Sequence, residues 1–217
     1  MPKMTGTRLF AEMLKGYGVT HVFFVPTILM ESLAEMDSLG IRKILTHSEK
    51  AAAYMADGYA RAAGRPGVCM AQQIGASNLA SGLRDGFMGC TPMIAITGGP
   101  APAGRYRHAY QEVEDITQFD SVTKLNMQLD DMARFPDLLR QMFRVATTGA
   151  PGPVHLRLRG SHGQGVESEG DLQPLAEKLL DQARAPRGAI VVLAPDGRIL
   201  ALAGRRREML EQTVKEA

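Results

Sequence analysis

Short apolar runs alternate with longer segments of helical periodicity along residues 1–160, and this alternation restricts the possible folds most strongly. The runs are rich in Val, Ile and Leu and mostly lack a polar residue at every second position, as is typical of parallel strands buried on both faces. Strands are expected at 21–25, 41–45, 67–71, 93–97, 122–126 and 154–158. Helices are expected at 8–17, 28–37, 49–63, 78–88, 112–119 and 131–146. The sequence therefore predicts an α/β fold with a doubly wound, mostly parallel six-stranded sheet, helices on both faces and a short C-terminal extension.

Residues that start and stop helices agree with these limits. Thr5 precedes the first expected helix as its N-cap, because a threonine oxygen accepts a hydrogen bond from a free helix N–H. Gly18 follows that helix and Gly64 ends the third one, since glycine readily adopts the positive φ found just beyond a helix.

The chain changes character after residue 160, where a Gly- and Ser-rich stretch resembles a linker. Residues 1–160 are therefore expected to form one domain, and 161–217 a linker and the start of another unit. That second unit is expected to contain a helix at 172–185, a strand at 189–193, a turn at 195–197 and a helix at 208–216. So short a segment rarely builds a core of its own, and we expect it to pack on a neighbour.

Composition excludes several classes of protein. A formal net charge of +2 over 217 residues indicates neither a nucleic-acid partner nor a membrane surface. No apolar run approaches the roughly 20 residues that span a bilayer, and no signal region opens the sequence, so the expected location is the cytoplasm. The two cysteines, Cys69 and Cys90, are expected to be buried thiols, and no Cys or His spacing predicts a metal site.

Ligands of open parallel sheets bind beyond the carboxyl ends of the strands, where Glu49 begins an expected helix with Ser48 or His47 as its cap. One interpretation is that its carboxylate complements the helix dipole, a contribution of about 0.3–1 kcal/mol. The other rests on the small apolar residues that follow, at 51–56. Close packing there would raise the pKa of the acid and let it share a proton with a ligand nitrogen.

Two further junctions at this edge remain open to two interpretations each. The loop around Gly75 is either a phosphate cradle or a tight turn with Ser77 or Asn78 capping the next helix, and it lacks the established nucleotide-binding motifs. Gln111 closes a long loop, which is either functional or simply the start of a helix. His21, His108, His155 and His162 are scattered, and structural roles are expected for them.

The segment 49–69, EKAAAYMADGYARAAGRPGVC, resembles the sequence around the catalytic glutamate of the thiamine-diphosphate superfamily of acetolactate synthase, pyruvate oxidase and benzoylformate decarboxylase. The resemblance continues collinearly over the first 160 residues through 75–79, 92–98, 110–112, 122–124 and 143–154. It implies that 1–160 is the pyrimidine-binding domain of such an enzyme and that 161–217 link into a truncated middle domain.

The resemblance also implies a role for individual residues. Glu49 would be the catalytic acid that hydrogen-bonds N1′ of the aminopyrimidine and so assists loss of the thiazolium C2 proton. Pro26, Gly75 and Asn78 would line the pyrimidine side of the cofactor site. Gln111 would lie near the thiazolium ring and the substrate.

The same resemblance implies that the active site needs a second, diphosphate-binding domain with a GDG motif, which this sequence lacks. The expected activity is a thiamine-diphosphate-dependent decarboxylation or carboligation of a small 2-oxoacid, with the chain inactive alone. The implied partners are a second copy of the chain, a separate diphosphate-domain subunit, or both. Mg²⁺ would enter only through the diphosphate domain, and FAD is left open.

Three departures from the family pattern leave the substrate open. Ser48 stands where a histidine usually precedes the glutamate, Phe24 and Thr27 replace glycines beside Pro26, and Gln73-Ile74 replaces Gly-Pro. The changes in the Pro26 and Gly75 loops also favour an alternative, a non-catalytic binding or regulatory module that keeps the fold and its dimer surface. A flavin-mononucleotide-binding, flavodoxin-like domain is a third hypothesis.

Overall fold

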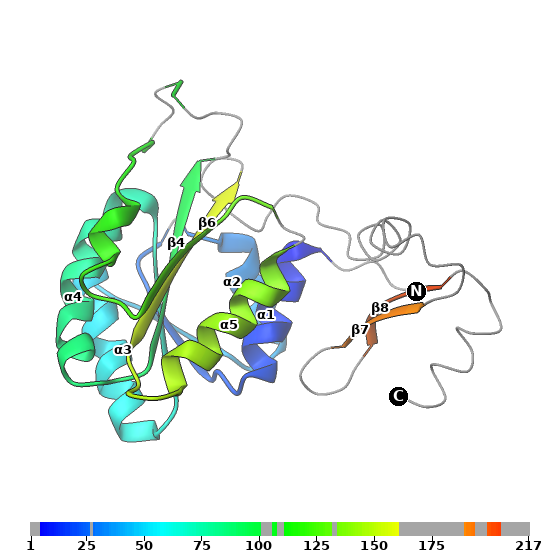
Figure 1. The fold of residues 1–217 in the computed structure, drawn as a ribbon, viewed down its shortest axis with the longest axis horizontal. Coiled ribbons are helices and arrows are strands. Elements are labelled where there is room, and N and C mark those ends of the chain that lie inside the picture. The colour runs from blue at the N-terminus through cyan, green and yellow to red at the C-terminus, as the bar shows by residue number, and fades with distance from the viewer. Residues whose placement is uncertain are drawn as a thin grey trace.

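A sheet lies at the centre of the molecule, between two layers of helices (Figure 1). Its six strands are parallel, in the order β2-β1-β3-β4-β6-β5. The computed structural model describes residues 5–26, 28–100, 106–107, 111–131, 134–160, 189–193 and 199–204. The strands are β1 His21–Phe24, β2 Arg42–Leu45, β3 Gly67–Ala71, β4 Met93–Pro100, β5 Leu125–Leu129 and β6 Pro153–Gly160. This architecture confirms the doubly wound α/β fold that the sequence predicts.

Helices cover both faces of the sheet. Helices α3 and α4 lie on one face, and α1, α2 and α5 lie on the other (Figure 1). Their bounds are α1 Gly6–Gly16, α2 Met30–Ser38, α3 Glu49–Ala63, α4 Ala76–Met88 and α5 Phe135–Thr147. Two short 3-10 helices are also present. The first, η1 Gln73–Gly75, follows the carboxyl end of β3, and the second, η3 Ile116–Phe119, precedes β5.

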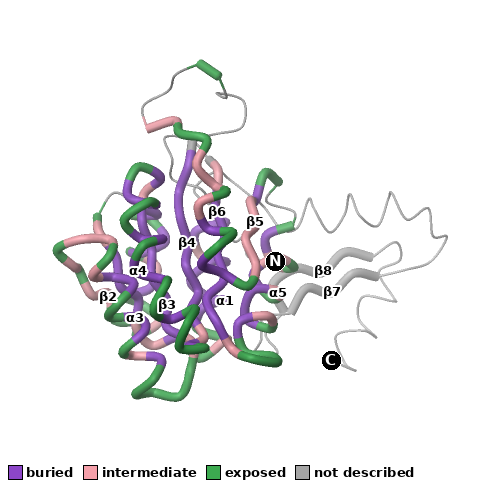
Figure 2. The backbone as a smooth tube through the Cα atoms, turned by 60° about the vertical axis from the view of Figure 1, so that its left-hand side comes forward, coloured by how far each residue is buried: buried purple, intermediate pink, exposed green. Residues whose placement is uncertain are grey.

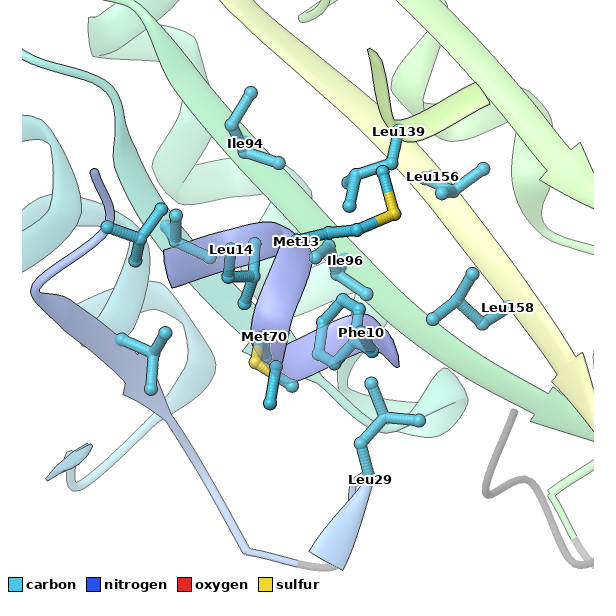
Figure 3. Packing of buried hydrophobic residues seen from close by; sticks show 14 of the residues in the cluster. Phe10, Met13, Leu14, Leu29, Met70, Ile94, Ile96, Leu139, Leu156 and Leu158 are labelled. Atoms are coloured by element: carbon cyan, nitrogen blue, oxygen red, sulfur yellow. The ribbon is translucent and has the colours of Figure 1, made fainter. Parts of the chain in front are cut away.

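The core has two layers because successive strand residues face opposite sides of the sheet. The larger layer gathers Leu, Ile, Met and Phe side chains between the sheet and α1, α2 and α5 (Figure 3). The other layer uses smaller residues such as Cys69, Ala71 and Ala95 beneath α3 and α4. The central strands are buried along most of their length, and the edge strand β2 is partly exposed (Figure 2).

Most of the expected helix signals occur in the structure. The Thr5 hydroxyl oxygen accepts a hydrogen bond from the Arg8 backbone N–H at 3.2 Å, and Gly18 and Gly64 have φ of 75° and 63°. The expectation that Ser77 or Asn78 caps α4 is wrong. This helix follows directly on η1 and begins at Ala76 without a side-chain cap, which leaves the Asn78 side chain available for another contact.

Two elements differ from the sequence prediction for tertiary reasons. Residues 112–115 have no regular secondary structure, and only 116–119 form a single 3-10 turn, so the expected helix at 112–119 is wrong. The next strand runs over 125–129 instead of 122–126, because Val122 and Thr123 lie in the turn that precedes it. The Thr123 hydroxyl donates a hydrogen bond to the Phe119 carbonyl at 2.8 Å and stabilises that turn.

In the C-terminal segment, β7 Ala189–Leu193 confirms the expected strand and pairs in antiparallel fashion with β8 Ile199–Gly204, which the sequence analysis did not predict. The elements expected at 172–185, 195–197 and 208–216 lie outside the described residues. The domain boundary at 160 stays a prediction.

Two further expectations can be compared with the structure. Cys69 is buried as expected, but Cys90 is exposed, so the prediction for Cys90 is wrong. It lies in the turn after α4 with a φ of 53°, outside the packed layers. Within the part of the chain that the structure describes, no helix has both the length and the apolar character needed to cross a membrane.

Candidate ligand-binding edge of the sheet

Glu49 is the first residue of α3 and lies beyond the carboxyl end of β2. Ser48 places it there: its backbone is extended, and its hydroxyl oxygen accepts a hydrogen bond from the Ala51 N–H at 3.2 Å. This N-cap makes the helix begin at Glu49. The local sequence thereby places the Glu49 carboxyl group at the edge where ligands of parallel sheets bind.

Two elements that follow β3 along the chain, η1 and α4, contact the Glu49 carboxyl group. The Asn78 side-chain amide of α4 donates a hydrogen bond to Glu49 Oε2 at 3.1 Å. Gly75, the last residue of η1, packs against the same group so closely that a Cβ added to it would lie 2.4 Å from Glu49 Oε1. A side chain at residue 75 would therefore displace the carboxyl group, which gives this glycine a role beyond that of a turn residue.

Helices α3 and α4 pack unusually closely, and this keeps Glu49 and Asn78 in register. Small residues make the approach possible, since a Cβ added to Gly82 would lie 2.7 Å from the Ala53 Cβ and 2.8 Å from the Lys50 carbonyl oxygen. The contact between Glu49 and Asn78 thus depends on the close approach of the two helices at Gly82, several residues away.

The five residues predicted from the sequence fall into two groups. Glu49, Gly75 and Asn78 form the first group, because their side chains or backbone lie in contact. Within the described residues, the hydrogen bond from Asn78 is the only one that Glu49 makes. Pro26 and Gln111 form the second group and make no such contact with Glu49. Pro26 is exposed just beyond β1. Gln111 is half-buried, has a φ of 61°, and its side-chain oxygen is buried without a hydrogen-bond partner. The ligand-binding roles of all five residues stay predictions.

A second polar group at the same edge was missed by the sequence analysis. Gln73 of η1 donates a hydrogen bond from its side-chain amide to the Val113 carbonyl oxygen, and the buried Arg157 of β6 pairs with Asp115. These two contacts tie Val113 to η1 and Asp115 to β6. The signal was present in the sequence, because VHLRL at 154–158 places two polar side chains on one face of a strand expected to be buried on both.

His155, the other of these side chains, belongs to a buried network on the α3–α4 side of the sheet. The Asn126 amide nitrogen donates to Asp120, so its oxygen accepts from His155 Nδ1–H at 2.6 Å. The Thr97 hydroxyl then donates to His155 Nε2 at 2.8 Å, and the Phe119 ring stacks on the imidazole. Burial, with a contribution from the nearby Arg157 charge, lowers the pKa of His155 well below its ordinary value. This histidine is therefore a neutral structural residue, as expected from the sequence.

The geometry of Glu49 suits one kind of chemistry. One carboxyl oxygen is held by an amide donor, and the other lies beside a glycine that leaves room for it. Such a group can exchange a hydrogen bond and a proton with a nitrogen atom of a ligand at the sheet edge. Among the described residues, no cluster of His, Cys, Asp and Glu is arranged to hold a metal ion.

Comparison with known proteins identifies related sequences. The family model for "Thiamine pyrophosphate enzyme, N-terminal TPP binding domain" matches residues 4–119. The probable acetolactate synthase large subunit of Methanocaldococcus jannaschii is 36% identical over 160 residues, which cover 71% of this chain. The chloroplastic acetolactate synthase of Arabidopsis thaliana is 36% identical over 69% of the chain, and the acetolactate synthase large subunit of Lactococcus lactis is 31% identical over 71%.

These matches involve only a part of each relative. The aligned residues cover 27% of the M. jannaschii protein, 23% of the A. thaliana protein and 27% of the L. lactis protein. The chain thus spans about a quarter of the length of the curated relatives that it matches.

Proposed function

Since the chain belongs to the thiamine pyrophosphate enzyme family and carries its N-terminal TPP binding domain, we propose that it is the pyrimidine-binding half of a thiamine-diphosphate-dependent 2-oxoacid decarboxylase or carboligase. The observation that carries this proposal is the Glu49 carboxyl group, held by Asn78 and packed on Gly75 at the carboxyl edge of the sheet. The acetolactate synthases among its relatives support the reaction class.

In this proposal each residue has a limited task. Glu49 holds a proton at the ring nitrogen of the aminopyrimidine through the carboxyl oxygen that Asn78 does not occupy. Asn78 orients the carboxyl group, and Gly75 allows it to sit against η1. Pro26 and Gln111 complete the wall of the site. When bound, thiamine diphosphate supplies an electron sink for the carbon–carbon bond chemistry.

The proposal requires a second protein surface for the diphosphate and its Mg²⁺. We infer that a diphosphate-binding domain, in a separate subunit or elsewhere in a longer chain, completes the site, and that two copies of this chain associate in the assembly. The short span of the chain relative to the synthases supports this inference. FAD binding would depend on residues outside this chain.

The decisive experiment combines the full chain with a protein that carries the diphosphate-binding domain, thiamine diphosphate and Mg²⁺. Pyruvate consumption and cofactor binding are both measured. Substitution Glu49→Gln, which keeps the shape and removes the titratable proton, should lower kcat by about 10²–10⁴-fold. The matched control is Glu31→Gln, the same change at an exposed position on α2, which should leave kcat unchanged.

The same measurements separate catalysis from a regulatory function, which the altered loops around Pro26 and before Gly75 favour. Activity that is the same in Glu49→Gln and in the unaltered chain would remove the catalytic role. A complex that forms but shows neither cofactor binding nor turnover would support a regulatory module.

A further inference from the structure

Among the described residues, four buried side-chain atoms at the carboxyl edge of the sheet have no hydrogen-bond partner: Gln72 Oε1, Gln73 Oε1, Gln111 Oε1 and Arg157 Nε. We call Gln73, Gln111 and Arg157 the Gln73 cluster. Buried polar groups in native proteins are nearly always paired, so an unpaired donor and unpaired acceptors in one region indicate that a further group belongs there. Neither the packing of the sheet nor the Glu49 contact set accounts for them.

Arg157 provides the donor. Its side chain is only 2% exposed, and its Nη2 pairs with Asp115, so the charge of the guanidinium is already balanced. What remains is the Nε–H, a hydrogen-bond donor that cannot act as an acceptor. The missing group therefore has to accept one hydrogen bond, and it need not carry a negative charge.

Gln73 provides an acceptor whose identity is fixed. Because its amide nitrogen donates to the Val113 carbonyl, the free atom must be the oxygen. That oxygen lies 2.8 Å from the point where a Gly99 Cβ would be, and Arg157 Cδ lies 3.5 Å from the same point. The free acceptor and the side chain with the free donor thus flank one glycine. Gln111 stands in the chain two residues before Val113, the residue that Gln73 contacts.

A hydroxyl group satisfies both requirements, since it accepts one hydrogen bond and donates another. A carboxylate can only accept, and an ammonium group can only donate. The cluster is also one 3-10 turn away from the Glu49 contact, because η1 runs from Gln73 to Gly75. We propose that the Gln73 cluster binds a hydroxyl group of the substrate, and that the substrate is a hydroxylated 2-oxoacid. The choice of 2-oxoacid rests on the function proposed above.

Nuclear magnetic resonance of the ¹⁵N-labelled full chain tests this with two acids that differ by one hydroxyl group, hydroxypyruvate and pyruvate. The Arg157 Nε–H signal, assigned by its loss in Arg157→Lys, reports directly on the donor. Hydroxypyruvate should shift this signal and the Gln73 side-chain NH₂ signals and bind about two- to tenfold more tightly than pyruvate, as one added hydrogen bond implies. Equal affinities for the two acids, or an unchanged Arg157 signal, would overturn the proposal.

A variant series locates the effect. In Gln73→Met the preference for hydroxypyruvate should disappear, whereas in Gln141→Met, the same change on α5 at the opposite face of the sheet, it should persist. Should Gln73→Met fail to fold, Gln111→Met provides the same comparison. A water molecule that exchanges slowly with bulk solvent beside Arg157 Nε–H and is not displaced by hydroxypyruvate would mean a structural water only, which overturns the proposal.

The outcome is independent of Glu49 chemistry. Binding of hydroxypyruvate at the Arg157 signal should be the same in Glu49→Gln as in the unaltered chain. If thiamine diphosphate fails to act through Glu49 while the hydroxyl preference remains, the proposed function fails and the hydroxyl site stands. If the cofactor acts through Glu49 and the preference is absent, only the hydroxyl site fails.

Discussion

At the residue scale, Glu49 shows how one carboxyl group depends on two neighbours from two other elements, η1 and α4. Asn78 donates to one of its oxygens, and Gly75 makes way for the other. The helix-dipole interpretation of Glu49 is compatible with its place in the first turn of α3, but it explains neither contact. The Asn78 amide contacts one carboxyl oxygen, and Gly75 lies beside the other. A site that positions an acid explains this arrangement better.

His155 gives a pH-dependent prediction at the same scale. Its pKa is lowered in the folded chain by burial and by Arg157, while the unfolded chain has the ordinary value of about 6.5. Below that pH the unfolded state binds more protons, so the free energy of unfolding should fall as the pH drops below about 6.5, by up to about 1.4 kcal/mol per pH unit from this group. Urea unfolding between pH 7.5 and 5.0 measures the slope.

The matched variant for that experiment is His155→Gln. Its side-chain amide keeps one hydrogen-bond donor and one acceptor near the positions of the imidazole nitrogens but does not titrate. The slope between pH 6.5 and 5.0 should be smaller in this variant. Identical slopes in both proteins would show that His155 does not govern the acid sensitivity.

At the element scale, the close contact of α3 with α4 determines whether the site forms. Ser48 starts α3 and Gly64 ends it, both through local interactions, and the sequence predicts the bounds of this helix correctly. The spacing between the helices is a separate matter, since it depends on Gly82 and Ala53 meeting across them. The cap decides where Glu49 begins the helix, and the packing decides that Asn78 reaches it.

A glycine-to-alanine pair tests this packing. Gly82→Ala should lower the free energy of unfolding by about 1–3 kcal/mol, because its Cβ would overlap the Ala53 Cβ and the Lys50 carbonyl oxygen. Gly58→Ala, the same change inside α3 where a Cβ would meet nothing within 4 Å, should raise it by about 0.5–1 kcal/mol. Chemical denaturation measures both, and destabilisation of equal size in the two variants would contradict the packing argument.

At the scale of the whole molecule, all described core residues lie between Leu9 and Leu158. The described parts of both hydrophobic layers therefore lie within the residues expected to form the first domain. The β7–β8 pair forms a sheet of its own and adds no strand to the six.

A chain that ends at Gly160 should consequently fold without the remaining residues. Its free energy of unfolding is expected to agree with that of the full chain within about 0.5 kcal/mol, the usual limit for changes away from packed contacts. Urea unfolding followed by circular dichroism checks this. A loss of several kcal/mol would place part of the domain core beyond residue 160 and move the predicted boundary.

The sequence alone determined the six strands of the main sheet, five of the six helices expected among them, the two-sided burial of the sheet and the position of Glu49 at its carboxyl edge. These features follow from apolar periodicity, caps and turn glycines, which act over a few residues. Only the tertiary structure decided the contacts of the site: Asn78 meets Glu49 across 29 residues, Gln73 reaches Val113 across 40, and Arg157 pairs with Asp115 across 42. The last two contacts keep 112–115 out of the helix that local propensity favours, because side chains distant in the sequence bind this segment more strongly than one helical turn stabilises it.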